Sequence, residues 1–391
     1  MANTIDILGD DILSDMIISR NITELVDDVI TSIGTSAFAY CTNLTSVDFP
    51  AVTSIGNSAF SSCTNLTNVD FPLVTTIGTD TFKNCLNLTN VNFPAVTSIG
   101  GYTFFNCTNL TNVNFPAVTS IGGYTFYDCS NLTNVDLPIV TSIGAYAFSG
   151  CTKLTSVDFP LATSIGNNAF SGCTNLTNVD FPLVTTIGST AFRGCINLTS
   201  VDFPAVLTIQ SNTFNSCSSL TTVNFSLVTT IRESAFSGCL SLTSIDFPLA
   251  ITIGSSAFYR CSNLTSINFP LVTTIGNGAF NGCITLTSVD FPLATTIGAD
   301  AFNGCSSLIT ADFSLVTTIS DSAFIRCGNL TSLILRNTET VVTLNNTNAF
   351  NSAPNCIIYV PDSLVDDYKE ATNWSIYADR IKGLSELPET E

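Results

Sequence analysis

The chain is 391 residues long; 45% of its residues are apolar and only 10% are charged, a composition that excludes a disordered low-complexity chain. Acidic residues outnumber basic ones by 30 to 11, for a formal net charge of −19. Such a surface repels phosphate groups, which excludes nucleic acid and anionic membrane surfaces as partners. No apolar run approaches the ~20 residues that cross a bilayer, so membrane insertion is not expected.

Residues 1–34 are predicted to form an N-terminal cap. In residues 20–34 we recognise a degraded copy of the repeat that follows, with Asp27 and Asp28 in place of Phe and Pro as a polar outer face. The apolar residues before it predict a short amphipathic helix over the open end: Ile5, Leu8, Ile12, Leu13 and Met16. An attachment segment, or self-association through the ends, is the alternative. No basic n-region precedes these residues, so no classical signal peptide is visible.

Residues 35–336 are an array of near-identical units of 22 residues. The unit that begins at Leu66 reads LTNVDFPLVTTIGTDTFKNCLN, and Phe recurs at every step from Phe38 to Phe324 without an insertion. A fixed period of this length predicts a solenoid, in which each unit buries a face against its neighbours. The expected fold is an α/β repeat solenoid, a right-handed leucine-rich-repeat coil with one long parallel β-sheet and short helical turns opposite.

Each unit begins with a predicted strand. Leu44, Val47 and Phe49 point inward by alternation, and Pro50 ends the strand because proline cannot donate to a sheet. The apolar pair Val52 and Ile55 follows. Gly56 is then expected to supply a permissive turn.

The second half of each unit is predicted to be a helical turn. Ala59, Phe60 and Cys63 share its inner face, and Asn65 is expected to take the left-handed conformation that returns the chain to the next strand. Fourteen of the fifteen cysteines recur at intervals of 22, which indicates buried, inert thiols; disulfides between neighbouring repeats are the alternative.

Three outward columns cover the predicted strand face. They begin at Thr45, Ser46 and Asp48, and none of the eleven Lys and Arg residues falls in them. The third column is a ladder of Asp and Asn, which is our candidate ligand-binding surface: Asp48, Asp70, Asn92, Asn114, Asp136, Asp158, Asp180, Asp202, Asn224, Asp246, Asn268, Asp290 and Asp312.

Four successive acids in this ladder repel one another at the ~5 Å spacing of neighbouring strands. They are Asp136, Asp158, Asp180 and Asp202. Solvation and hydrogen bonds to neighbouring Thr and Ser would offset the repulsion. The functional alternative is binding of a divalent cation, a basic partner or sugar hydroxyls; Ca²⁺ fits the oxygen ligands, although no ligand loop like that of an EF-hand is present.

Residues 337–391 are predicted to be a divergent last repeat and a helical C-terminal cap. A four-residue expansion precedes Phe350, and Asp362 is expected to cap an amphipathic helix that carries Tyr368. Trp374 is predicted to lie in the core of this cap, with Tyr377 beside it.

The unit L-x-x-V-x-F-P-x-V-T-x-I-G-x-x-A-F-x-x-C resembles the BspA-like branch of leucine-rich repeats, found in bacterial surface proteins and in some phage and protist proteins. The resemblance covers residues 22–350, and the tail from Ile357 resembles the C-terminal cap of such arrays. Residues 333–348 are more similar to members from gut Firmicutes and their phages. The resemblance implies an adhesin that binds host proteins, glycans or other cells.

The chain contains no histidine, which excludes Ser-His-Asp and Cys-His nucleophiles and His-based metal sites. Nor does it contain a Walker loop, a dinucleotide fingerprint or a CxxC pair. We therefore expect no enzymatic activity and no cofactor other than Ca²⁺.

Three functions fit the repeats. The first is an acidic adhesin or receptor-binding module that holds a protein or glycan on a cell surface through the strand face. The second is a rigid spacer or assembly protein, for example a phage tail or virion component. Ice binding through the Thr column is the third, which the Asp column and the expected curvature oppose. The first two place the chain at a cell surface, outside the cell or on a virion, although production without export stays open.

Overall fold

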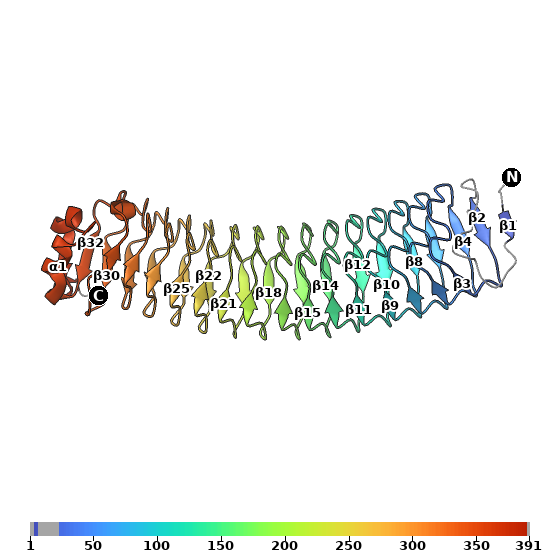
Figure 1. Ribbon diagram of the computed structural model, residues 1–391, viewed down its shortest axis with the longest axis horizontal. Helices are drawn as coiled ribbons and strands as arrows, with labels where there is room; N and C mark the ends of the chain where they lie inside the picture. Colours follow the sequence, from blue (N-terminus) through green and yellow to red (C-terminus); the bar gives the residue numbers. More distant parts are fainter. Residues whose placement is uncertain (1–3, 7–22, 389–391) are drawn as a thin grey trace. The chain divides into compact units, whose positions relative to one another are not determined.

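The computed structural model describes residues 4–6 and 23–388. The chain divides into two compact units, Met1–Phe203 and Pro204–Glu391. Within each unit, successive 22-residue repeats form coils whose strands run parallel in neighbouring coils (Figure 1). The predicted parallel leucine-rich-repeat coil is thus confirmed.

In the first unit, the strand predicted at the start of each repeat is three residues long. Its register advances by 22 residues per coil, so Val113 lies beside Val135 and Val157 beside Val179. These strands are β1 (Thr4–Asp6), β2 (Glu24–Val26), β4 (Ser46–Asp48), β6 (Asn68–Asp70), β8 (Asn90–Asn92), β10 (Asn112–Asn114), β12 (Asn134–Asp136), β14 (Ser156–Asp158), β16 (Asn178–Asp180) and β18 (Ser200–Asp202).

A second parallel sheet, which the sequence did not predict, contains the Ile of each V-T-S-I-G stretch. Ile121 pairs with Ile99 on one side and Ile143 on the other. Its two-residue strands in the first unit are β3 (Ser32–Ile33), β5 (Ser54–Ile55), β7 (Thr76–Ile77), β9 (Ser98–Ile99), β11 (Ser120–Ile121), β13 (Ser142–Ile143), β15 (Ser164–Ile165) and β17 (Thr186–Ile187).

The second unit repeats both kinds of strand. Its longer strands are β20 (Thr222–Asn224), β22 (Ser244–Asp246), β24 (Ser266–Asn268), β26 (Ser288–Asp290), β28 (Thr310–Phe313), β30 (Ser332–Leu335), β32 (Ile357–Val360) and β33 (Ile381–Gly383). Its shorter strands are β19 (Thr208–Ile209), β21 (Thr230–Ile231), β23 (Thr252–Ile253), β25 (Thr274–Ile275), β27 (Thr296–Ile297), β29 (Thr318–Ile319) and β31 (Thr343–Leu344).

Rows of identical side chains fill the core of each unit. Phe126 stacks between Phe104 and Phe148 with ring centroids 5.5 and 5.2 Å apart, and all three rings are fully buried. In the second unit, Phe350 stacks on Phe324 at 5.6 Å in spite of the four-residue expansion between them. The inward residues were therefore predicted correctly.

The turn opposite the strands is not helical, contrary to our prediction. Ser58 and Ser62 both have positive φ, at 55° and 62°, a conformation that no helix contains. Their N–H groups donate to Thr79 and Lys83 of the next coil, whereas the N–H groups of Ser61 and Cys63 close tight turns within the coil. Along this turn, hydrogen bonds to the next coil alternate with hydrogen bonds within the coil, and this pattern takes the place of helical hydrogen bonds.

Two local predictions in this turn are also wrong. The left-handed residues lie at Ser58 and Ser62 and not at Asn65, whose side chain instead accepts a hydrogen bond from the Asn87 amide at 3.2 Å. Gly56 is needed for close packing and not for a left-handed φ, because a Cβ atom there would lie 2.7 Å from the backbone nitrogen of Thr35 in the preceding coil.

At the N-terminal end, the described part of the degraded repeat, residues 23–34, stacks as predicted, with Leu25 beside Val47. Asp27, however, is buried and not part of an outer face: its carboxylate accepts hydrogen bonds from the N–H groups of Val29 and Ile30 at 2.8 and 2.9 Å. The helix predicted to include Ile5 is wrong at this residue, because Thr4–Asp6 forms the strand β1, parallel to β2. The rest of the predicted helix, residues 7–19, lies outside the described residues.

The C-terminal cap contains η1 (Thr347–Phe350), η2 (Asp362–Leu364), the α-helix α1 (Val365–Glu370), η3 (Ser375–Arg380) and η4 (Leu384–Glu386). α1 is labelled at the C-terminal end in Figure 1. Asp362 does not cap this helix as predicted, because its carboxylate accepts hydrogen bonds from the N–H and hydroxyl groups of Ser385. Trp374 is fully buried, as expected.

Candidate functional site

The strand face carries the three predicted columns. In β14 the side chains of Ser156 and Asp158 are exposed and Val157 between them is buried. Because neighbouring strands are parallel and in register, Asp158 lies directly beside Asp180. Of the thirteen predicted ladder residues, twelve are exposed and Asp312 is half-buried.

The Thr column stabilises the coil. The hydroxyl of Thr67 donates to the carbonyl of Thr45 at 3.1 Å, and that of Thr89 donates to the carbonyl of Thr67 at 3.0 Å. The same bond recurs further along the array, for example from Thr133 to Thr111. The hydroxyl protons of this column are therefore used within the protein, and a ligand would meet mainly acceptor oxygens.

Asn residues in the ladder donate hydrogen bonds to neighbouring acids. The Asn92 amide donates to the Asp70 carboxylate at 2.9 Å, and the Asn268 amide donates to Asp246 at 2.8 Å. Such bonds to a carboxylate are stronger than bonds between neutral groups. The alternation of Asn with Asp thus relieves repulsion in both units.

The last acid of the ladder is paired with an arginine that the column pattern did not reveal. Arg336 donates to both oxygens of Asp312, at 2.8 to 3.1 Å. Arg336, Ile334 and Leu384 are among the residues that line a cleft of about 590 Å³ beside this pair. No basic residue lies in the three columns themselves, as predicted, but Arg336 reaches back onto them from the end of β30.

Three successive acids of the first unit have no such partner. Asp136, Asp158 and Asp180 are exposed, and no side chain or N–H group of the described residues forms a hydrogen bond or ion pair with their carboxylates. We call these three residues the acidic row. Each coil contributes a single carboxylate to it.

The cation site predicted at Asp136, Asp158, Asp180 and Asp202 stays a prediction. Among residues 4–6 and 23–388, no three Asp, Glu or Cys side chains converge so that they could hold a metal ion. Calcium prefers six to eight oxygen ligands, whereas the row offers one carboxylate per coil.

Comparison with protein families identifies the repeats. The model of the BspA type leucine rich repeat region, which spans six copies, matches residues 31–155, 141–253 and 251–366. The chain belongs to this family. The resemblance that the repeat motif indicated is thereby confirmed.

Among solved structures, this BspA-type protein is similar to a leucine-rich repeat protein from Bacteroides ovatus, with 31% identity and a TM-score of 0.71 over 78% of this chain and 82% of that one. A leucine rich cell surface protein from Faecalibacterium prausnitzii matches at 26% identity and a TM-score of 0.41, over 80% and 84% of the two chains. No curated protein matches significantly. In the described part of the chain, no helix is both long and apolar enough to cross a membrane.

The thiols of this BspA-type chain lie inside the coils. All fifteen cysteines are free and buried, and the Cys85 thiol donates to the carbonyl of Phe60 at 3.2 Å. Burial raises the pKa of Cys85 and of Cys173 to about 12. Because all fifteen thiols are free and buried, the prediction of buried cysteines is confirmed over the disulfide alternative. A thiol with that pKa is not ionised near neutral pH, which agrees with the predicted lack of reactivity.

A row of exposed aliphatic side chains, which the sequence analysis missed, follows the strand face. Ile139, Leu161 and Leu183 occupy the third position after the strand in three successive coils, and they are 37, 44 and 49% exposed. We call these three residues the aliphatic row. In the sequence, this row could have been recognised from the residue that directly follows each Pro. That residue is Ile or Leu in these three coils and is often Ala in the other coils of the first unit.

Aromatic residues form a second non-repetitive feature of the first unit. Tyr124 stacks between Tyr102 and Tyr146 at 4.6 and 4.5 Å, and the Lys83 ammonium lies 5.3 Å from the centroid of the Tyr102 ring. The faces of these rings are thus largely covered by one another and by Lys83. Packing between coils accounts for this cluster.

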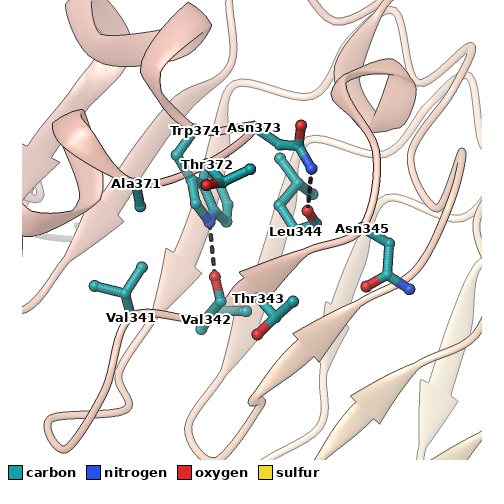
Figure 2. Close-up of a pocket in the computed structure, with 9 residues that line it drawn as sticks. All are labelled: Val341, Val342, Thr343, Leu344, Asn345, Ala371, Thr372, Asn373 and Trp374. Atoms are coloured by element: carbon teal, nitrogen blue, oxygen red, sulfur yellow. Dashed lines mark hydrogen bonds between the residues drawn. The ribbon is translucent and has the colours of Figure 1, made fainter.

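The cleft in Figure 2, of about 430 Å³, marks where the cap closes the second unit. Trp374 Nε1–H donates to the carbonyl of Val342 and the Asn373 amide donates to that of Leu344, both at 2.7 Å. In the preceding coil, the corresponding carbonyls accept N–H groups from the next coil. The polar side chains of this cleft therefore replace a missing coil and terminate the sheet, which gives Trp374 its structural role.

Proposed function

We propose that this protein is a non-enzymatic adhesin or receptor-binding module that holds a protein or glycan on a cell surface through the strand face. The observation that carries the proposal is the acidic row. Asp136, Asp158 and Asp180 lie in adjacent coils without a neutralising neighbour among the described residues. Like charges at this spacing destabilise the folded chain, and a bound partner would remove that cost.

The fold itself does not require these acids. Asn92 and Asn114 occupy the same position in coils with the same strand register. A residue that costs stability and that the fold can replace is best explained by an external contact. Because surface proteins of bacteria meet such contacts outside the cell, we propose an extracellular or cell-surface location.

Arrays of glycans and of cell-surface proteins, probed with the full chain, test the proposal. Asp158→Ala and Asp180→Ala should abolish the signals that depend on the strand face, with folding verified by circular dichroism. Asp48→Ala, in the same column but outside the acidic row, is the matched control. If the first two variants bind like the unaltered chain, the ligand site does not lie on the acidic row and the proposal is wrong.

A rigid spacer or assembly protein, such as a tail component of a virion, is the second candidate. Its support is the uninterrupted stacking of Phe rings at 5.2 to 5.5 Å from Phe38 to Phe192 in the first unit, which gives each coil the same rigid core. A chain that binds nothing on either array, but that assembles through its ends, would favour the spacer.

A further inference from the structure

The aliphatic row and the acidic row occur in the same three coils. Asp136 precedes Ile139, Asp158 precedes Leu161, and Asp180 precedes Leu183, each by three residues. In the two coils before them, Asn92 and Asn114 are followed by Ala95 and Ala117. Over these five coils, Asp in the ladder therefore occurs with a large aliphatic residue three positions later, and Asn occurs with Ala.

The local backbone keeps the two rows close. In each coil a tight turn follows the strand, closed for example by the hydrogen bond from Ala162 N–H to the Phe159 carbonyl at 3.0 Å. Leu161 is the third residue of that turn and points to solvent. Three residues of chain span at most about 10 Å, so the rows run side by side along the array within that distance.

The folded chain gains little from an exposed Leu at this position. Ala95 and Ala117 show that the turn accepts a methyl group in its place. Large aliphatic side chains gathered on a surface are instead typical of a protein interface, whose centre is apolar and whose rim is polar or charged. The adjoining carboxylates would form such a rim.

We propose that the aliphatic row and the acidic row together dock an amphipathic helix of a protein partner, with the apolar face of that helix on Ile139, Leu161 and Leu183 and basic side chains opposite Asp136, Asp158 and Asp180. The inference rests on the proposed function and names the class of partner. Charge complementarity selects the occupant, because a chain of net charge −19 with three unpaired acids beside the apolar row attracts a basic segment.

The spacing of the coils favours a helix over an extended segment. Neighbouring coils lie ~4.8 Å apart and a helix advances ~5.4 Å per turn, so each turn meets one coil with a drift of only ~0.6 Å. An extended strand repeats its facing side chains every ~6.7 Å and drifts by ~2 Å per coil. Over three coils, the helix stays in register and the strand does not.

A sugar or a metal ion fits these two rows less well. Sugar hydroxyls and cations would use the acids but leave the three aliphatic side chains in water. A basic amphipathic helix uses both rows at once, and apolar burial would supply most of its affinity.

The test measures binding of a designed helical peptide of about 15 residues, roughly four turns, with Leu along one face and Lys or Arg beside it. Fluorescence anisotropy with the full chain is read at low salt and at physiological ionic strength. In the triple variant Ile139→Ala, Leu161→Ala and Leu183→Ala we expect affinity to fall about ten-fold or more, with salt dependence retained. In Asp136→Asn, Asp158→Asn and Asp180→Asn we expect weaker binding with most of the salt dependence lost.

Ala and Asn already occupy the equivalent positions in neighbouring coils. Both triple variants should therefore fold. Leu249→Ala, Leu271→Ala and Leu293→Ala, in the same turn position of the second unit, form the matched control and should bind like the unaltered chain. The proposal of a helical partner is wrong if the chain binds a peptide with Ser in place of Leu as tightly as the original peptide. It is also wrong if the Ala triple variant binds the original peptide as tightly as the unaltered chain does. Self-association of the chain that the Ala triple variant abolishes would make a second copy the occupant and also overturn it.

The array experiment separates this inference from the proposed function. Glycan binding that depends on Asp158 and Asp180, without any effect of the Ala triple variant, would leave the proposed function standing and refute the helical partner. Peptide binding that the Ala triple variant weakens supports the inference.

Discussion

Two neighbouring groups of coils in the first unit share one backbone and differ on one surface. The coils with β8 and β10 carry Asn92 and Asn114 in the ladder, and the Asn92 amide donates a hydrogen bond to Asp70. The coils with β12, β14 and β16 carry the acidic row and the aliphatic row. Inside, both groups have the same buried Leu and Cys columns and the same Phe column in the outer turn, although Leu137 replaces Phe directly after β12. The difference teaches that this fold separates its core from its strand face, so the surface can change without a change in the coil.

The largest effect we predict tests the shared core. Phe104→Ala in the first group and Phe148→Ala in the second should each lower the free energy of unfolding by about 3–5 kcal/mol, because both rings are fully buried and leave a cavity between stacked neighbours. Urea denaturation followed by circular dichroism measures both. If one variant were destabilised far more than the other, the two groups would not have equivalent cores.

A transplant tests whether the surface difference carries binding. Asn92→Asp, Asn114→Asp, Ala95→Leu and Ala117→Leu together should extend both rows by two coils and raise affinity for the basic helical peptide by about ten-fold, since more apolar area is buried. Titration of the peptide against both proteins gives the ratio. An unchanged affinity would show that extending the acidic row and the aliphatic row is not sufficient to extend the docking surface.

Neutralising the acidic row should stabilise the chain modestly. Asp136→Asn, Asp158→Asn and Asp180→Asn remove repulsion of roughly a few tenths of a kcal/mol per neighbouring pair, so the melting temperature should rise at low salt. The rise should shrink in about 1 M salt, where charges are screened. Asn92→Asp should do the opposite, because it removes the bond to Asp70 and adds a charge. A fall in melting temperature for the triple variant would mean that the three carboxylates stabilise the folded chain, contrary to the prediction.

The smallest effect concerns an acid of the second unit. Burial, and then the neighbouring Asp312, raise the pKa of Asp290, while Arg336 lowers it. The ionised form is therefore disfavoured in the folded chain, and this penalty is present above the folded pKa and disappears as pH falls through it. Asp290→Asn should raise the melting temperature slightly at pH 7 and not at about pH 3. An equal rise at both values would rule out ionisation as its cause.

The sequence was most informative where side chains face inward. The 22-residue period and the alternation at Leu44, Val47 and Phe49 predicted the strands, the rows of Phe and the buried thiols, because a residue repeated without insertion in stacked coils must meet its own copies. Trp374 was predicted as core of the cap for a similar reason, since large aromatic residues are rarely left in water. The ladder positions followed from the same alternation, although its role in binding stays a prediction.

The outer turn could not be derived in the same way. The spacing of Ala59, Phe60 and Cys63 is typical of the inner face of a helical turn. The chain instead takes a left-handed conformation at Ser58 and Ser62. The deciding contacts are N–H bonds to carbonyls of the next coil, 21 residues ahead, as from Ser58 to Thr79 and from Phe60 to Thr81. Local propensity does not contain those bonds.

The sequence by itself determined which face of each coil is buried and which carries the Asp and Asn ladder. Only the tertiary structure decided that Asp27 is a buried cap, that Arg336 neutralises Asp312 from beyond the columns, and that Leu161 with its neighbours lies in water beside the acidic row. The physical reason is that burial of a turn residue depends on how adjacent coils stack. The sequence pattern alone does not distinguish the exposed Leu after the Pro from a buried Leu of the core.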